Sequence, residues 1–145
     1  EINGIARRID APLADFAAAI ATYVQKIDPQ LVITHGSNGE YGHPQHIYTH
    51  RATRMALNSA RQGTAFMTWS AWHMPAEYER ILNQDDQADI ISDISPWHDI
   101  KVAAALCHQT QHAMFLRNSG APSVADMVRK TEAFHIWQGP LPQGL

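Results

Sequence analysis

The sequence predicts an α/β domain with a largely parallel sheet, because helical segments alternate with short apolar runs along its 145 residues. Asp10 is expected to cap the first helix, with Pro12 near its start. Apolar side chains then recur at steps of three and four from Leu13 to Ile27, and Asp28-Pro29 ends the helix. The apolar run 31–34 follows as a buried strand. Hydrophobic residues make up 45% of the chain, which is enough to bury a core.

The remaining elements continue this alternation after a glycine-rich loop at 35–42. Pro44 is expected to open a second helix that runs to about Arg61, and residues 65–69 form the next strand. The segment 70–89 is predicted to be irregular, with one helical turn near 76–82. The last predicted elements are a strand at 90–94, a long helix from Ser95 to about Asn118, a short helix at 123–130 and a strand at 132–137.

The composition excludes several classes of protein. With 11 Lys+Arg against 14 Asp+Glu the net charge is −3, so the chain is not built to hold nucleic acid by bulk charge. The single cysteine, Cys107, cannot form an internal disulfide and fits a reducing compartment, which favours a cytoplasmic location. No apolar run approaches the ~20 residues that a membrane span needs.

Nine histidines are present, and the densest group is His43-Pro44-Gln45-His46 with His50 four residues on. Pro44 at the start of a helix places His43 at its edge and puts His46 and His50 on one face. The group follows a strand and a glycine-rich loop, and ligands of open α/β sheets collect at the carboxyl ends of strands. Because imidazole suits zinc and neighbouring metals, the sequence predicts a divalent-metal site here.

Two residues just before this group are candidates for the same site. Tyr41 is placed to line a pocket and donate a hydrogen bond, and Glu40 to orient a histidine or to bind substrate hydroxyls. His35 is expected to shape the glycine-rich loop.

The stretch from Thr34-His35-Gly36 through Gly39, Tyr41 and Gly42 to His43-Pro44-Gln45-His46 resembles a motif of the PIG-L/LmbE-like family of zinc-dependent N-deacetylases. That motif reads approximately T-H/P-x-x-x-G-x-x-G-H-P-D-H. The likeness continues in Arg51-Ala52-Thr53 and Asp93-Ile94-Ser95 and extends over about 11–140. The resemblance implies a Rossmann-like, mostly parallel sheet with flanking helices, and Zn²⁺ or another divalent metal as cofactor. It also implies hydrolysis, by zinc-activated water, of an N-acyl group (expected to be N-acetyl) on a small amino-sugar conjugate.

The resemblance also assigns roles to single residues. It implies that His46 is a zinc ligand and that His43 lies near the scissile carbonyl, while His108 faces the substrate. Gln45 stands where the family usually has Asp. A neutral amide can orient an imidazole but stabilises an imidazolium less than a carboxylate does, which favours a neutral hydrogen-bond donor role for His43. Tyr41 and Glu40 are expected to contact substrate. Trp69 or Trp72 could stack on a sugar ring, although packing in the core or at an interface is preferred for the tryptophans.

The family's first motif, A-H-P-D-D-E, supplies two further zinc ligands and a base, and it does not occur in residues 1–145. The chain is therefore expected to be a single domain that forms the later portion of such a deacetylase, with its N-terminal part absent. It should bind zinc poorly alone, and associate with the missing segment or form a homo-oligomer.

Two alternatives remain open at this stage. One is a non-catalytic binding or interaction domain derived from the same fold, which Gln45 favours. The other is a self-contained metal site of His43, His46 and His50 that supports assembly, although a helix-surface role, or one behind a ligand, is preferred for His50.

Overall fold

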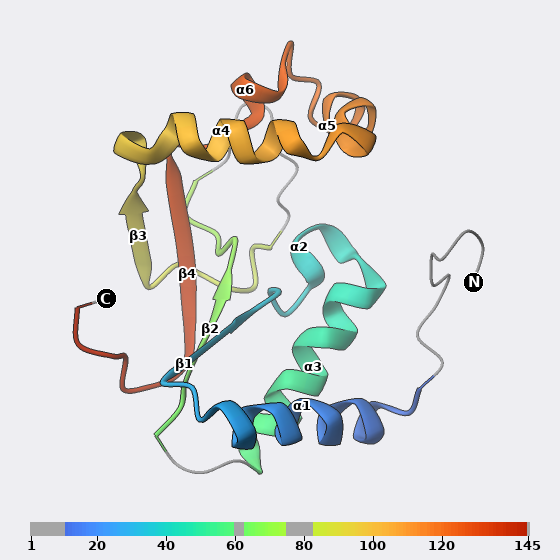
Figure 1. The fold of residues 1–145 in the computed structure, drawn as a ribbon, viewed down its shortest axis with the longest axis vertical. Coiled ribbons are helices and arrows are strands. Elements are labelled where there is room, and N and C mark those ends of the chain that lie inside the picture. Colours follow the sequence, from blue (N-terminus) through green and yellow to red (C-terminus); the bar gives the residue numbers. More distant parts are fainter. Residues whose placement is uncertain (1–10, 60–62, 75–82, 145) are drawn as a thin grey trace.

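The computed structural model describes residues 11–59, 63–74 and 83–144, which form a mixed α/β fold around a four-stranded sheet (Figure 1). The helical turn predicted near 76–82 lies outside the described residues. The strand order is β1-β2-β4-β3, and the strands are β1 (Leu31–Thr34), β2 (Ala65–Trp69), β3 (Ile90–Asp93) and β4 (Thr131–Gln138). All four lie within about a residue of their predicted bounds.

The expectation of a largely parallel sheet is wrong. β1 and β2 are parallel, but β4 is antiparallel to both of its neighbours, β2 and β3. Three strands still run in one direction, because β4 enters between β2 and β3 in the opposite sense. The carboxyl ends of β1, β2 and β3 therefore share one edge of the sheet.

The first helix, α1 (Leu13–Ile27), ends where predicted but begins at Leu13 rather than directly after Asp10, and it packs against α3 (Pro44–Asn58). Ala17 of α1 and two alanines of α3, Ala52 and Ala56, are buried together, since small side chains let the two helices approach closely. Pro44 is the first residue of α3, as predicted, and the helix ends at Asn58 rather than near Arg61.

The long helix predicted from Ser95 to Asn118 is broken. A 3₁₀ turn (Ser95–Trp97) leads into α4 (His98–Cys107), and a second 3₁₀ turn (Gln109–Gln111) leads into α5 (His112–Ser119). His108 between them has φ −81° and ψ 51°, which is not helical. Both α4 and α5 contact α6 (Val124–Met127), and a straight helix would not bring both onto this short element.

The α4–α6 group lies at the opposite end of the molecule from α1 (Figure 1). Lys101 of α4 pairs with Glu132 of β4 at 2.6 Å, which ties this group to the sheet. None of the helices in the described ranges is both long and apolar enough to cross a bilayer.

Candidate metal centre

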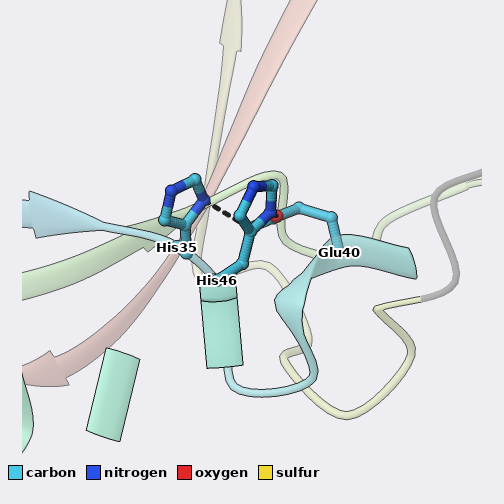
Figure 2. A group of neighbouring side chains, drawn as sticks. All are labelled: His35, Glu40 and His46. Atoms are coloured by element: carbon cyan, nitrogen blue, oxygen red, sulfur yellow. Dashed lines mark hydrogen bonds and ion pairs between the residues drawn. The ribbon is translucent and has the colours of Figure 1, made fainter. Parts of the chain in front are cut away.

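The segment after β1 brings His35, Glu40 and His46 together (Figure 2). His35 directly follows β1, Glu40 lies in the short α2 (Gly39–Gly42), and His46 lies in the first turn of α3. One ligand atom from each of the three lies within 4.8 Å of the others. The part predicted as a plain loop thus contains a helical turn, and that turn carries the carboxylate.

The carboxylate of Glu40 holds this arrangement together. Its Oε2 lies 2.5 Å from Nδ1 of His46, and its Oε1 accepts the backbone N–H of Gly36 at 2.8 Å and lies 3.3 Å from Nδ1 of His35. Glu40 is 3% exposed and adopts φ 62° with ψ −54°, a positive-φ conformation that residues other than glycine rarely take. The buried contacts hold the backbone there, and the carboxylate orients both imidazoles.

The histidine rings lie in a row. His35 and His46 are stacked with centroids 3.8 Å apart and planes at 10°, and His43 lies on the other side of the row at 4.2 Å from His46. Burial lowers the pKa of His35, and the Glu40 carboxylate offsets only part of this effect. This favours the neutral form of the His35 imidazole.

The donor set suits a divalent metal, since zinc sites use imidazole nitrogens and carboxylate oxygens. The ring stacking limits how an ion can bind, because an imidazole lone pair lies in the ring plane and two nearly parallel planes 3.8 Å apart do not meet at one ion. Nδ1 of His46 is bonded directly to Glu40, and no hydrogen bond to a described residue engages its Nε2. Nε2 of His46 is thus the nitrogen that fits a metal, with a carboxylate behind the ring.

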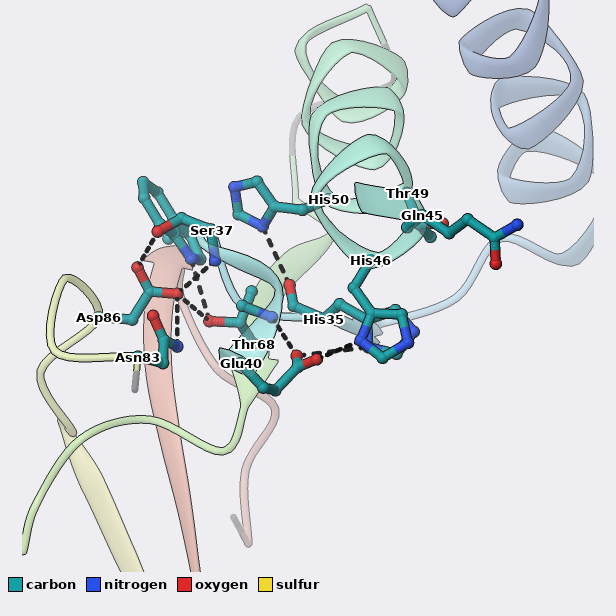
Figure 3. A network of polar contacts seen from close by, with 12 residues as sticks. His35, Ser37, Glu40, Gln45, His46, Thr49, His50, Thr68, Asn83 and Asp86 are labelled. Atoms are coloured by element: carbon teal, nitrogen blue, oxygen red, sulfur yellow. Dashed lines mark hydrogen bonds and ion pairs between the residues drawn. The ribbon is translucent and has the colours of Figure 1, made fainter. Parts of the chain in front are cut away.

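Three other residues that the sequence predicts for the site, two catalytic (His43 and Gln45) and one substrate-binding (Tyr41), lie close to this group in the chain. His43 precedes α3, and its buried Nδ1 has no hydrogen-bond partner in the described part of the chain, so it can still pair with a ligand. Tyr41 is 56% exposed and sets its ring edge-on to both His43 and His46, at 5.7 and 5.8 Å. The side chain of Gln45 extends away from Glu40 and His46 (Figure 3).

His50 and His108 take no place in the row of rings. His50 is 2% exposed, donates from Nδ1 to the backbone oxygen of His35 at 3.0 Å and packs against Trp137, so the expected helix-surface position is wrong. His43, His46 and His50 therefore do not form a three-histidine site. His108 is exposed at the end of α4, and no hydrogen bond or ring contact between described residues joins it to His46.

A second buried carboxylate, which the sequence did not reveal, fastens the loop from the other side (Figure 3). Asp86 accepts the backbone N–H of Ser37 at 2.7 Å, its hydroxyl at 2.5 Å and the amide of Asn83 at 3.2 Å. A Cβ on Gly36 would lie 2.3 Å from Nδ2 of Asn83, so any larger residue there would have to displace the Asn83 side chain from its place beside Asp86. Asn83 and Asp86 both come from the irregular segment before β3, where nothing in the local pattern distinguishes them from surface polar residues.

An imidazole–carboxylate group at the carboxyl edge of an α/β sheet defines a candidate site for a divalent metal. No family model matches the chain. It is similar, however, to proteins named 1D-myo-inositol 2-acetamido-2-deoxy-alpha-D-glucopyranoside deacetylase from three bacterial genera.

The identity to each of these three relatives is 30%. The match to the protein of Mycobacterium sp. (strain KMS) covers 72% of this chain and 41% of the relative. For Mycolicibacterium smegmatis the shares are 75% and 46%, and for Saccharomonospora viridis 79% and 50%. The chain thus spans about half the length of these relatives or less. They confirm the relationship with the PIG-L/LmbE-like N-deacetylases that the histidine motif indicates.

Proposed function

We propose that this chain is part of a metal-dependent N-deacetylase, a hydrolase that removes an acetyl group from the amine of a small amino-sugar conjugate. The observation that carries the proposal is the state of His46, whose Nδ1 is held by a buried carboxylate and whose Nε2 is left for a metal. In this view residues 1–145 form one domain, the later portion of a Rossmann-like deacetylase domain. The base and two further ligands would come from outside this chain.

His46 would hold the metal in this reaction. When bound, zinc supplies acidity to a water molecule and polarises the amide carbonyl. His43, in contact with the His46 ring, is placed to donate a hydrogen bond to the carbonyl oxygen as negative charge develops there. Gln45 replaces the usual carboxylate, and its side chain points away from His46.

The substrate class follows from the names of the relatives and from two exposed aromatic side chains. The relatives are named for an acetamido sugar joined to inositol. Tyr41 lies edge-on to His46, and Trp69, 39% exposed at the end of β2, lies 5.6 Å from the His35 ring. Such aromatic faces suit the apolar face of a sugar ring. Glu40 is buried against His35 and His46, so it is not proposed to contact substrate. The proposed substrate contacts are Tyr41 and Trp69, and His108 is a further candidate.

The test is amine release from an N-acetylglucosamine conjugate by the full-length protein, with zinc and with a chelator. His46→Ala should lower kcat/KM at least about 100-fold, because a metal ligand is lost. His98→Ala is the matched control, since His98 bonds the backbone oxygen of Val128 away from the site and its loss should leave the rate unchanged. Activity that survives both the chelator and His46→Ala would contradict the proposal.

A second candidate is a non-catalytic domain that binds the same class of sugar conjugate. The observation that favours it is Gln45, a neutral amide where the family motif has a carboxylate. The zinc-loaded full-length protein would then bind the conjugate in calorimetry but release no amine.

A further inference from the structure

We propose that Glu40 is a positioning residue that fixes His46 in the Nδ1–H tautomer and so leaves Nε2 with the lone pair that binds a divalent metal. The inference rests on the proposed function, because it concerns the metal ligand of that site. It adds a residue that acts on the metal through another side chain.

The hydrogen-bond inventory around Glu40 determines the tautomer. An ionised carboxylate can only accept, so the imidazole nitrogens that face it must carry hydrogen. Nδ1 of His46 lies 2.5 Å from Oε2, and Nδ1 of His35 lies 3.3 Å from Oε1. A neutral imidazole carries one N–H, so hydrogen on Nδ1 leaves Nε2 unprotonated. A carboxylate behind the ring also makes Nε2 a more basic ligand.

The backbone of Glu40 gives independent support. Its φ of 62° is a conformation that glycine adopts freely and that other residues adopt at a cost. A glutamate nevertheless stands there, with its side chain 4% exposed beneath two histidines. Strain of this kind persists where the surrounding contacts over-determine it, and here those contacts are the bonds from the carboxylate to Gly36, His35 and His46.

A nearly isosteric substitution separates the charge and acceptor role of Glu40 from its shape. In Glu40→Gln the backbone N–H of Gly36 still needs an acceptor, so the amide oxygen occupies the Oε1 position. The amide NH₂ then replaces Oε2 and faces Nδ1 of His46, which must become an acceptor. The hydrogen moves to Nε2, so the tautomer inverts while the packing is retained.

The measurement is long-range ¹H–¹⁵N NMR of the histidine rings in the full-length protein, followed by titration with Co²⁺. The native protein should show Nδ1–H at His46, and Glu40→Gln should show Nε2–H together with about a 10–100-fold loss of Co²⁺ affinity at that residue. Glu132→Gln is the matched control, because its ion pair with Lys101 lies at the sheet edge near α4 and its loss should change neither readout.

The outcomes distinguish this inference from the proposed function. An Nε2–H tautomer in the native protein, or Nδ1–H retained with unchanged Co²⁺ affinity in Glu40→Gln, would overturn the role of Glu40 and leave the metal role of His46 standing. Native protein in which Co²⁺ does not perturb His46 would overturn both. If the backbone spectrum shows that Glu40→Gln is unfolded, Glu40→Gly is used instead, because glycine accepts φ 62°; His46 should then exchange between tautomers.

Discussion

The buried carboxylate of Asp86 allows a quantitative test of how the histidine loop is held. Asp86 is 1% exposed and accepts four hydrogen bonds, from the backbone and hydroxyl of Ser37, from the amide of Asn83 and, at 3.4 Å, from the hydroxyl of Thr68. Hydrogen bonds to a charged group contribute roughly 1.5–3 kcal/mol each, and they are not additive. In Asp86→Asn one acceptor oxygen becomes a donor that faces another donor, so we expect a loss of about 3 kcal/mol in the free energy of unfolding at pH 7.

The pH dependence of this loss gives a second, independent readout. Burial raises the pKa of Asp86, but the hydrogen bonds from Ser37 and Asn83 together lower it by more, so the pKa lies below its usual value. A lowered folded-state pKa stabilises the fold at pH values above the unfolded pKa of ~3.9, and this stabilisation is lost as the pH falls through the folded value. The difference in the free energy of unfolding between the native protein and Asp86→Asn should therefore become smaller below about pH 4.

Urea unfolding followed by circular dichroism between pH 3 and 7 measures both quantities. Asp85→Asn is the control, since it removes the same charge from the exposed neighbouring residue and should change stability by less than about 0.5 kcal/mol. The reasoning would be refuted if Asp86→Asn lowered the free energy of unfolding by no more than the control does. It would also be refuted if the loss in Asp86→Asn stayed constant down to pH 3.

Two further predictions concern the same loop. Gly39→Ala should lower the free energy of unfolding, measured in urea, by about 1–3 kcal/mol, because the new Cβ at φ 69° would lie 3.0 Å from Ile47. Gly120→Ala is the control, since Gly120 has a similar φ of 73° but no atom within 4 Å of the new Cβ, and it should lower the free energy of unfolding by less. Equal losses in the two variants would contradict the argument from crowding. Burial lowers the pKa of His50, so its stabilising contribution is present above about pH 6.5 and is lost as the pH falls through the folded value. His50→Asn, which keeps a donor for the His35 carbonyl, should therefore unfold with a flatter pH dependence between pH 7 and 5, and an unchanged slope would show that His50 does not titrate in this way.

Local patterns predicted the elements of this fold but not all of their relations. The end of the first helix at Ile27 and both bounds of the strand 65–69 are as predicted, because apolar periodicity and the flanking Pro and Gly residues act within one element. The reversed direction of β4 and the break at His108 depend on contacts with β2, β3 and α6, which no local pattern encodes. The alternation of helices and strands therefore predicted the α/β class correctly, but it wrongly predicted a largely parallel pairing of the strands.

The candidate site divides in the same way. His43 and His46 could be named from a motif of four consecutive residues, and Glu40 could be named as a residue that orients a histidine or contacts substrate. The distances that favour orientation, to Gly36 and His46, exist only in the folded loop. Asp86 had no sequence signal, because its partner Ser37 is 49 residues away.

That separation also bears on how the chain matures. Synthesis proceeds from the N-terminus, so the histidines leave the ribosome well before Asp86 does. Until then Ser37 has water in place of its carboxylate partner, and the loop has no anchor on the side of β2. The histidines of the proposed metal site therefore reach their final positions only after Asp86 has been synthesised and has bonded to Ser37.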